Sequence, residues 1–371
     1  MKNLLVICGG KSAEHEVSIR SARNIISALD QQAYKPILVT VSRSGSWYLS
    51  DSAELPESIT ECDDAAFPGE LATLLRQPDS TLLITTTGKT HRVDIAFPLI
   101  HGPMGEDGTL QGLLEMMEVP YVGSGVLASA IGMDKDVLKR ILANANIPIV
   151  PFIAPSSFQQ APSFAQACEH LNSSILFVKP SIMGSSVGIY KVKTAAEYDL
   201  AVSQAFKFCH KILIEKYIPG REVECSVLGN LNPQASCVGE IRPNHEFYSY
   251  EAKYIDPNGA DLIIPADFNT MMTNKIRDLA IQTFQAIECK GFARVDFFVT
   301  EDTVYVNELN SIPGFTSISM YPKMWEASGL SYSALISQLL VLAMEEFALK
   351  QQLHFRPETL TVAHPAKIAI A

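Results

Sequence analysis

The stretch FARVDFFVTEDTVYVNELNSIPG, residues 292–314, has the pattern of two β-strands joined by a short turn. Phe, Val and Tyr fill both runs, but polar residues interrupt them. Arg294 and Asp296 lie in the first run, and Glu308 and Asn310 lie in the second. The members of each pair are two positions apart, so both point to one face of their strand. A buried hairpin needs a physical reason to gather an arginine, two carboxylates and an amide on one face.

Strand pairing brings these two polar pairs together. If the turn comprises residues 301–303, Asp296 lies opposite Glu308 and Arg294 lies opposite Asn310. Opposed residues have Cβ atoms roughly 4.5–5.5 Å apart, so the two carboxylates repel each other. Burial strengthens the problem, because an unpaired ion costs several kcal/mol to remove from water. The pattern therefore requires either solvent or a ligand at this face.

Two explanations fit the polar face. The first is the exposed side of an edge hairpin, where water solvates the charges. The second is a site for a hard cation, because carboxylate and amide oxygens suit Mg²⁺, which keeps water ligands and takes others from substrate phosphates. Arg294 would then neutralise negative charge on the reacting group. The second explanation predicts that another region of the chain completes a nucleotide site.

Length, charge and cysteine content narrow the class of protein. A chain of 371 residues has room for two or three domains. Its net charge of −11 argues against nucleic acid as a partner, although a small anion needs only a local basic pocket. No apolar run approaches the roughly 20 residues that cross a bilayer, so no membrane is expected. Seven scattered cysteines without a C-x-x-C pair favour reduced thiols in the cytoplasm over a disulfide or zinc framework.

The chain divides by pattern into three regions and a tail. Apolar strands alternating with helical runs predict a parallel, Rossmann-like α/β domain over residues 1–123, with a turn-rich surface insert near residues 43–90. Residues 124–216 begin with helical periodicity and continue as short strands. Residues 217–350 hold further strands, the hairpin and an apolar C-terminal helix. Residues 351–371 show no periodicity and are expected to be peripheral.

Two nucleotide-binding motifs are matched only in part. Gly10-Lys11-Ser12 supplies the end of a P-loop, but that motif needs a glycine five positions before Gly10, where this chain has Leu5. Residues 123–128, GSGVLA, fit the pattern G-x-G-x-x-A, but no Asp or Glu follows about 20 residues later. A tight turn before a helix explains the second match, so neither motif decides the function.

The central region offers the second half of a nucleotide site. Lys179 ends an apolar strand, where its ammonium is costly unless an anion meets it. The loop SIMGSSVG follows, with Gly184 and Gly188 for close backbone approach and Ser185 and Ser186 as hydroxyl donors. Taken alone, this loop equally fits an ordinary serine–glycine turn. Lys135, taken alone, better fits a solvated residue at a helix start. Glu215 and Glu222 fit salt-bridge partners as well as they fit ligands for amino or hydroxyl groups.

Eight segments resemble, in this order, those of D-alanine–D-alanine ligases: GGKSAEHEVS, HGPMGEDGTLQG, MDK, VKPSIMGSSVG, LIEKYIPGREVE, YSYEAKY, ARVDFF and NELNSIPGFTSIS. The resemblance extends over about residues 1–345. It implies an ATP-grasp fold, in which two α+β domains clasp ATP beside an N-terminal α/β domain. It also implies an activity, the ATP-dependent joining of two D-alanines through a D-alanyl phosphate for peptidoglycan synthesis.

The resemblance assigns metal and nucleotide residues. Two Mg²⁺ ions, for which Mn²⁺ can substitute, would be held by Asp296, Glu308 and Asn310, with Glu308 bridging both ions. The phosphates of ATP, the co-substrate, would meet three lysines and the serine loop: Lys135, Lys179, Lys253, Ser185 and Ser186. Adenine and ribose would be held by Glu215, by the backbone of Lys216 and Ile218, and by Glu222.

The resemblance also assigns residues that bind the first D-alanine. Glu14 would bind its ammonium group. Ser185 would connect Glu14 to Tyr254 in a lid near residues 242–265, which should exclude water from the acyl phosphate. His101 occupies the position of a substrate-side histidine.

The remaining assignments concern the second substrate. Arg294 and the backbone N–H of Gly314 would stabilise the tetrahedral oxyanion, while Ser319 and the backbone of Met320 would bind the second carboxylate. A ligase that takes D-serine or D-lactate as the second substrate is the alternative, although Tyr254 resembles the dipeptide-forming class. All metal-ligand positions are kept, which argues against a silent nucleotide-binding relative. The family resemblance also implies a homodimer.

Overall fold

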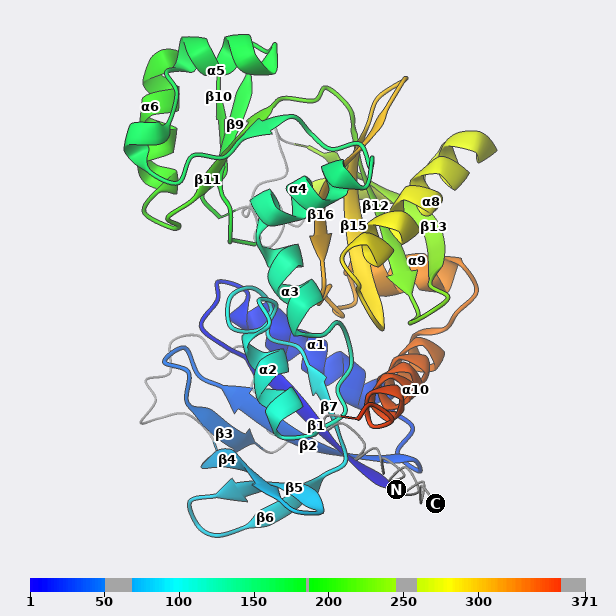
Figure 1. Ribbon diagram of the computed structural model, residues 1–371. Coiled ribbons are helices and arrows are strands. Elements are labelled where there is room, and N and C mark those ends of the chain that lie inside the picture. Colours follow the sequence, from blue (N-terminus) through cyan, green and yellow to red (C-terminus); the bar gives the residue numbers. More distant parts are fainter. Residues whose placement is uncertain (51–68, 185–186, 245–258, 355–371) are drawn as a thin grey trace, which may run out of the picture.

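The computed structural model describes residues 1–50, 69–184, 187–244 and 259–354. One sheet and its helices form the lower half of the molecule in Figure 1, and two further sheets form the upper half. Four predicted site residues lie outside the described residues: Ser185, Ser186, Lys253 and Tyr254. So do residues 51–68, most of the predicted lid and most of the tail.

The first sheet has seven strands in the order β6-β5-β4-β3-β2-β1-β7. Strand β1 (Lys2–Gly9) pairs in parallel with β2 (Tyr34–Val41) and β7 (Ile95–Pro98), which confirms the predicted parallel α/β core. Its buried residues alternate between two cores, because helices cover both faces. Helices α1 (His15–Ala28) and α10 (Tyr332–Lys350) pack on one face, and α2 (Thr109–Met116) packs on the other (Figure 1).

The other four strands correct the prediction for residues 43–90. The described residues of this segment, 43–50 and 69–90, are not a turn-rich surface insert. They form β3 (Trp47–Ser50), β4 (Glu70–Gln77), β5 (Ser80–Thr85) and the start of β6 (Thr90–Val93), which extend the sheet by antiparallel pairing. β4 alternates between half-buried and exposed positions, so only one of its faces packs. Short one-sided strands bury few apolar side chains, and the turn residues between them therefore dominate the sequence pattern.

The second sheet has four strands, in the order β10 (Tyr190–Val192), β9 (Leu176–Pro180), β11 (Ile212–Lys216) and β8 (Phe152–Ile153). Helices α5 (Phe164–Leu171) and α6 (Ala195–Ala205) cover one face, and a short 3₁₀ helix (Phe158–Gln160) precedes them. Val178 and Ile214 point into that core. Because side chains alternate along a strand, the neighbouring Lys179 and Glu215 point to the opposite face.

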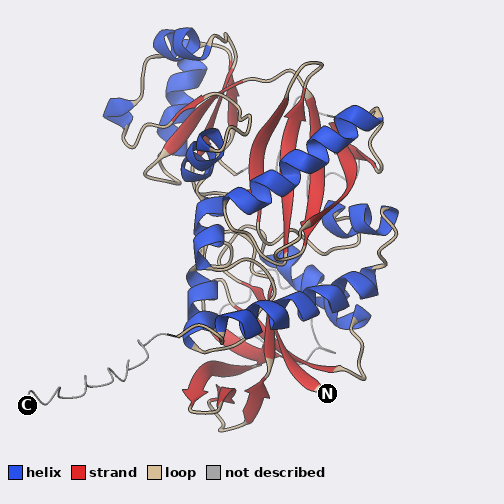
Figure 2. Cartoon of the chain, turned by 45° about the vertical axis from the view of Figure 1, so that its right-hand side comes forward, coloured by secondary structure: helices blue, strands red, loops and turns tan. Residues whose placement is uncertain are grey.

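The third sheet has five antiparallel strands, in the order β14 (Ala260–Ile263), β13 (Gln234–Pro243), β12 (Arg221–Leu228), β15 (Phe292–Val299) and β16 (Val304–Asn310). Three helices share a core with one face: α3 (Val126–Met133), α4 (Lys135–Asn144) and α8 (Thr270–Ala286). Figure 2 shows α8 lying across this sheet. Helix α9 (Met320–Ala327) packs on the other face through Met320 and Met324. The hairpin therefore forms one side of this sheet, with β15 inside and β16 at the edge.

Helix α10 bears on the membrane prediction. Its 19 residues are long and apolar enough to cross a bilayer by length and composition alone, contrary to the expectation that no run approaches this length. One such helix is weak support for a span, because the core helices of soluble proteins pass the same test. Leu335, Ile336, Leu339 and Leu340 pack in the core shared with α1 and β1.

In the structure, the polar residues of the hairpin pair as the sequence predicts, but the turn length and the register along the strands differ from the prediction. Arg294 lies opposite Asn310, and Asp296 lies opposite Glu308. The turn is one residue longer than expected, because Val299 pairs with Val304. An irregularity beside Asp296 shifts the register and restores the predicted pairing at the polar end.

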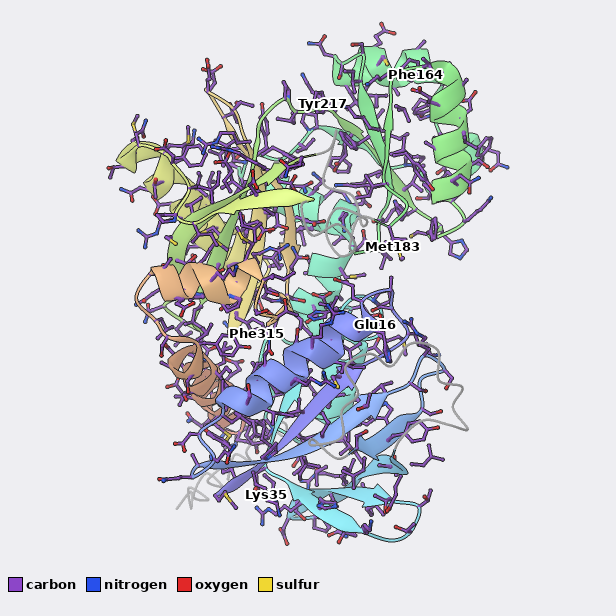
Figure 3. All side chains as sticks on the ribbon, turned by 180° about the vertical axis from the view of Figure 1, so that it is seen from behind. Glu16, Lys35, Phe164, Met183, Tyr217 and Phe315 are labelled. Carbon is purple, nitrogen blue, oxygen red and sulfur yellow. The ribbon has the colours of Figure 1, made fainter. Side chains whose placement is uncertain are left out.

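An aromatic cluster joins the first sheet to the third. The ring centroid of Phe97 lies 6.4 Å from that of Phe292 and 5.9 Å from that of Phe315, both with edge-on geometry. Helix α1 holds the backbone of Phe315, because Ser21 accepts its N–H at 3.1 Å and Asn24 donates to its carbonyl at 3.1 Å. Figure 3 shows Phe315 at the boundary between the lower and upper halves. The loop after the hairpin is thus fixed to the N-terminal sheet.

Candidate active site

One cavity of about 290 Å³ opens at the boundary between the first and third sheets. Its lining comes from parts of the chain that are far apart in sequence. Residues predicted for the substrate and metal sites are among its lining: Glu14, His101, Arg294, Glu308, Asn310, Gly314, Ser319 and Met320. The structure therefore brings together eight of the predicted site residues around one space.

Arg294 is the centre of the acidic part of this cavity. It donates two parallel hydrogen bonds of 2.7 Å to the carboxylate of Asp296, and its Nε lies 3.0 Å from Glu224 Oε2. Burial alone would lower the pKa of Arg294, but Asp296 and Glu224 outweigh burial and raise it well above the ordinary value. Asn310 donates from Nδ2 to Asp296 Oδ2 at 2.9 Å. Its carbonyl oxygen is thereby oriented away from Asp296 as a potential ligand.

Lys135 links the hairpin to the glycine–serine loop. Its Nζ donates to the carbonyl of Met183 at 2.7 Å and lies 3.2 Å from Glu308 Oε2. Asp134, the N-cap of α4, accepts the backbone N–H groups that begin the helix and so fixes the base of Lys135. Lys135 thus occupies the space between the carboxylate of Glu308 and the loop, as a phosphate-binding lysine would. Figure 3 places Met183 at the same boundary as Phe315.

A second, cationic cluster lies between the four-stranded sheet and α4. Lys179 Nζ lies 2.8 Å from Glu215 Oε2 and donates to Asn307 Oδ1 at 3.2 Å. Lys139 Nζ lies 2.9 Å from the other carboxylate oxygen, Glu215 Oε1. Burial would raise the pKa of Glu215, but the charges of Lys139 and Lys179 outweigh burial and lower it. Glu215 is therefore an ionised carboxylate, although it is only 3% exposed.

Lys139 is a residue that the motif analysis missed. It lies four positions after Lys135, and this spacing places both lysines on the buried side of α4. The available signal was a lysine at an otherwise apolar helix position, because Leu138 and Leu142 on either side of it are fully buried.

The other predicted adenine and ribose residues lie near the start of the third sheet. Lys216 ends β11, and its backbone N–H donates to the carbonyl of Pro151 at 3.0 Å. Ile218 is buried, and its carbonyl accepts from Gly220 at 2.9 Å. Glu222 lies on β12, opposite Phe298 and Ile241. These backbone groups follow Glu215 directly, so they border the cationic cluster.

His101 and Glu106 hold one backbone unit of the hairpin end. His101 Nδ1 donates to the carbonyl of Ile312 at 2.9 Å, so Nε2 is the acceptor in the neutral ring. Burial lowers the pKa of His101 and favours this neutral form. Nε2 is buried and has no hydrogen-bond partner within the described residues.

Glu106 is the second residue that the motif analysis missed. It accepts from the N–H groups of Gly102 at 2.7 Å and Ile312 at 3.0 Å. Burial, reinforced by Glu14, raises its pKa to about 8, although both N–H groups and Lys135 act in the opposite direction. The signal was its place five positions after His101 in the segment HGPMGEDG. His101 and Glu106 together fix the start of the loop that carries Gly314.

The backbone of Gly314, in the loop after the hairpin, lies close to the side chain of Ser319. A Cβ at Gly314 would lie 2.7 Å from Ser319 Oγ, which is closer than real contacts allow. Ser319 Oγ also accepts the N–H of Thr316 at 3.0 Å, and Met320 begins α9 directly after Ser319. On the opposite wall, a Cβ at Gly184 would lie 3.4 Å from Glu14 Oε2, so the glycine–serine loop closely approaches Glu14. The cavity thus ends between two backbone segments.

Comparisons with known proteins find relatives along the whole chain. Family sequence models described as D-ala D-ala ligase N-terminus and D-ala D-ala ligase C-terminus match residues 3–124 and 141–341. The D-alanine–D-alanine ligase A of Salmonella typhimurium is 47% identical over 346 residues, which cover 92% of this chain and 95% of that protein. The D-alanine–D-alanine ligase of Oceanobacillus iheyensis is 43% identical over 363 residues, with coverage of 95% and 98%.

Solved structures agree with these relatives. The D-alanine–D-alanine ligase of Coxiella burnetii superposes with a TM-score of 0.82 at 38% identity and covers 95% of this chain and 97% of its own. The VanG D-Ala:D-Ser ligase of Enterococcus faecalis gives 0.81 at 32% identity, with coverage of 92% and 99%. These similarities confirm the predicted ATP-grasp fold. The chain belongs to the D-alanine–D-alanine ligase family.

Proposed function

We propose that the protein joins two D-alanines to D-alanyl-D-alanine with hydrolysis of ATP to ADP and phosphate, in the synthesis of peptidoglycan precursors. The observation that carries this proposal is the single cavity lined by Glu14, Arg294, Glu308 and Gly314. It places a carboxylate suited to an ammonium group beside a guanidinium and a backbone loop suited to an oxyanion. Family membership and the reduced cysteines favour the cytoplasm as its location.

The metal ligands of the proposal are Asp296, Glu308 and Asn310. They supply two carboxylates and one amide oxygen, the hard oxygen donors that Mg²⁺ prefers, and Mn²⁺ can replace it. Within the described residues no group of three or more His, Cys, Asp and Glu side chains could hold a metal ion. The donor set fits because Mg²⁺ takes its remaining ligands from water and nucleotide phosphates. When bound, two such ions supply positive charge that screens the triphosphate from the attacking carboxylate.

The nucleotide is proposed to lie between the second and third sheets. Lys135 and Lys179, together with Lys253, would contact its phosphates, and Ser185 and Ser186 would cover them. The adenine and ribose would meet the segment that follows β11: Glu215, Lys216, Ile218 and Glu222. Lys135 supports this placement, because it already spans the space from Glu308 to the loop carbonyl of Met183.

The first chemical step joins the D-alanine carboxylate to the γ-phosphoryl group. A carboxylate oxygen attacks the γ-phosphorus, the bond to the β-phosphate bridging oxygen breaks, and ADP leaves with its electron pair. Glu14 holds the ammonium group of this D-alanine and so orients its carboxylate toward the phosphate. Tyr254 and Ser185 would connect Glu14 to the lid, which excludes water from the acyl phosphate.

The second step forms the peptide bond. The amine of the second D-alanine, after loss of a proton, attacks the acyl carbon, and phosphate leaves with the C–O electron pair. Arg294 and the N–H of Gly314 stabilise the oxyanion of the tetrahedral intermediate. Ser319 and the N-terminal backbone of α9 at Met320 receive the second carboxylate, while His101 lines the substrate side of the cavity.

A single assay tests this function and the alternative second substrates. ADP release should appear with ATP and D-alanine alone, and D-serine or D-lactate added with D-alanine should not raise it. The VanG relative named for D-Ala:D-Ser ligation makes this comparison necessary. ADP release only in the presence of D-serine or D-lactate would replace D-alanine as the second substrate.

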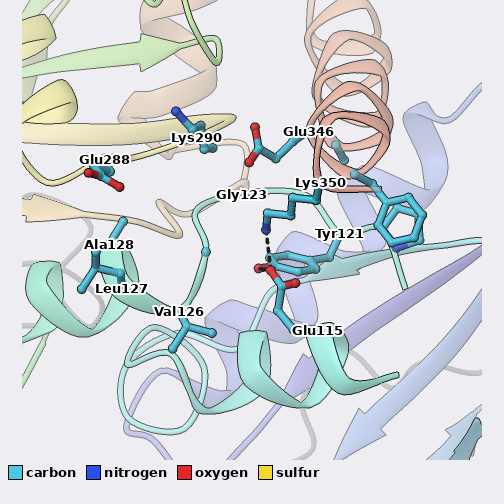
Figure 4. A pocket seen from close by; sticks show the side chains of 14 residues that line it. Glu115, Tyr121, Gly123, Val126, Leu127, Ala128, Glu288, Lys290, Glu346 and Lys350 are labelled. Atoms are coloured by element: carbon cyan, nitrogen blue, oxygen red, sulfur yellow. Dashed lines mark hydrogen bonds and ion pairs between the residues drawn. The ribbon is translucent and has the colours of Figure 1, made fainter. Parts of the chain in front are cut away.

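The homodimer is proposed to use an apolar patch on α2 and α3. Four apolar side chains on these neighbouring helices are exposed: Met116 (78%), Leu127 (58%), Val126 (43%) and Leu113 (37%). Figure 4 shows Val126 and Leu127 at the start of α3, beside a cavity of about 260 Å³. Exposed apolar side chains gathered on neighbouring helices are typical of interfaces. Sedimentation should show a dimer that Leu127→Asp dissociates, while Leu200→Asp, at another exposed leucine, should leave it intact.

The domain limits stay a proposal: residues 1–123 for substrate binding, residues 124–216 and 217–350 for the nucleotide, and residues 351–371 as a tail. Helix α10 belongs to the third of these regions in sequence but packs on the first sheet. The chain therefore returns to the proposed substrate domain near its end, where α10 packs on the first sheet.

A further inference from the structure

Lys139 is a buried cation for which the proposed chemistry has no use. Its side chain is 1% exposed, and its Nζ lies 2.9 Å from Glu215 Oε1. The ring centroid of Phe152 lies 5.7 Å from the same ammonium. A lysine removed from water loses several kcal/mol of hydration free energy, and such a position is tolerated only when a specific partner offsets the loss. That partner is Glu215.

The pair decides the protonation state of Glu215. Burial by itself would favour the neutral acid, which can donate a hydrogen bond as well as accept one. Lys139 and Lys179 reverse this preference and lower the pKa of Glu215. Burial lowers the pKa of Lys139 to about 8, which still leaves it charged near neutral pH. Glu215 is therefore an acceptor only, and any group that contacts it must be a donor.

Lys139 and Lys179 make different contacts and have different roles. Lys179 also donates to Asn307 Oδ1 at 3.2 Å, and it is the second-last residue of β9, the strand that precedes the glycine–serine loop. An arriving phosphate would share the charge of Lys179. Lys139 lies on α4, on the opposite side of Glu215, and would keep its contact with the carboxylate. Glu215 Oε1 is buried and faces Lys139 Nζ at 2.9 Å, and a carboxylate oxygen has a second lone pair, so it retains capacity for one ligand donor.

We propose that Lys139 is a positioning residue that sets base specificity in the nucleotide site. By holding Glu215 as a fixed anion, it makes the site accept the 6-amino group of adenine and reject the 6-oxo group of hypoxanthine or guanine. This inference rests on the proposed function, because it takes Glu215 as part of the adenine site. An oxo group facing Oε1 would place two acceptors in contact without water, a strongly unfavourable arrangement.

The test compares ATP with inosine triphosphate, which differs at the 6-position. Affinities are measured by displacement of a fluorescent ATP analogue from the full chain without D-alanine. Lys139→Met keeps the length of the side chain and removes its charge. The ratio of ATP to inosine triphosphate affinity should fall by roughly 10-fold or more, because Glu215, left with only one of its two lysine partners, takes up a proton more readily and can then donate to the oxo group. Lys139→Arg should restore most of the ratio.

The control is Arg140→Met, which removes the next charged residue of α4 from its exposed side. It should leave the ratio unchanged. Equal loss of affinity for both nucleotides in Lys139→Met would mean a structural role only and would overturn the inference. An unchanged ratio would overturn it as well.

A double variant covers the case in which Lys139→Met fails to fold. Lys139→Met combined with Glu215→Gln removes both charges of the Lys139–Glu215 pair, and Lys179 keeps its hydrogen bond to Asn307 Oδ1. Its nucleotide ratio should equal that of Glu215→Gln alone, because Lys139 acts only through the carboxylate. A further change in the ratio contradicts the inference. Absence of ligation with D-alanine would defeat the proposed function, whereas these affinities would still report on Lys139.

Discussion

Two clusters of charged side chains flank the proposed reaction path, and they differ in the sign of their charge. Within the described residues, the hairpin cluster groups the carboxylates of Glu224, Asp296 and Glu308 around Arg294. The second cluster reverses this composition, because two lysines surround the single carboxylate of Glu215. An acidic cluster suits cations, and a basic cluster suits phosphate. The pairing of both on adjoining sheets is what a metal–nucleotide complex requires.

The clusters also differ in how much their neighbours constrain them. The first lines an open cavity, and its members have geometry that a ligand can complete. The second is enclosed, with Lys139 and Lys179 almost fully buried. Changes in the first should therefore act mainly on the rate of ligation, and changes in the second mainly on nucleotide affinity.

Removal of a charge from the acidic cluster has the largest expected effect. Glu308→Gln is nearly isosteric but weakens the site for cations, so the rate of ligation should fall by at least roughly 100-fold. ADP release measures the rate of ligation. The midpoint of thermal unfolding measures stability and should change little. Glu301→Gln, on the exposed turn of the same hairpin, is the matched control. Near-normal turnover in Glu308→Gln would remove the cation site from the proposal.

Arg294→Lys keeps the positive charge of the acidic cluster and removes the planar guanidinium group. It therefore separates the effect of charge from the effect of hydrogen-bond geometry. Lysine cannot form the paired hydrogen bonds to Asp296, and hydrogen bonds to charged groups contribute about 1.5–3 kcal/mol. The value of kcat should therefore fall roughly 10- to 100-fold. Arg221→Lys is the control, because Arg221 binds Glu240 with two nitrogens on the same sheet outside the cavity. Equal losses in both variants would point to a general effect on the sheet.

Lys179→Met breaks the basic cluster at the residue nearest the glycine–serine loop. The KM for ATP should rise by roughly 10-fold, equivalent to about 1.4 kcal/mol, with a smaller change in kcat. Initial rates over a range of ATP concentrations measure both constants. Lys193→Met, at an exposed position in the same domain, should have no such effect. A fall in kcat alone would place Lys179 in the chemical step and weaken the contrast between the clusters.

The smallest expected effect concerns the pH dependence of stability at Glu106, which lines the same cavity as the hairpin cluster. Its pKa is about 8 in the folded chain against an ordinary value of 4.5. Between these values the folded chain holds a proton that the unfolded chain has lost, so the free energy of unfolding falls as pH rises from about 4.5 to about 8. Glu106→Gln cannot titrate and should show a shallower decline by urea unfolding. Parallel pH profiles for the two proteins would contradict this explanation.

The main elements follow from local pattern. Strands β1, β2 and β7 are continuous apolar runs, and the helices from Lys135, Thr270 and Tyr332 have clear start signals and long apolar faces. The segment 43–90 was predicted wrongly because its strands are short and pack on one side only. Whether this segment forms strands depends on the sheet edge beside it, and the local sequence pattern carries no information about that edge.

The site follows from sequence where its residues occur in spaced motifs, as on the hairpin. Lys139 and Glu106 were not predicted as site residues, because lysine and glutamate are common at ordinary helix and loop positions. Their roles depend on partners distant in sequence, Glu215 on β11 and the backbone of Ile312. Such contacts become visible only when sheets and loops are placed in space.

Local periodicity by itself determined the long apolar strands and helices and the polar face of the hairpin, because side-chain direction alternates with period two along a strand. Tertiary packing alone decided that α4 brings Lys139 to Glu215 and that His101 and Glu106 hold Ile312. It also decided that an irregularity beside Asp296 restores the pairing with Glu308 despite a longer turn. The reason is that desolvation and charge pairing depend on which distant groups share the same buried space, and no local pattern specifies those groups.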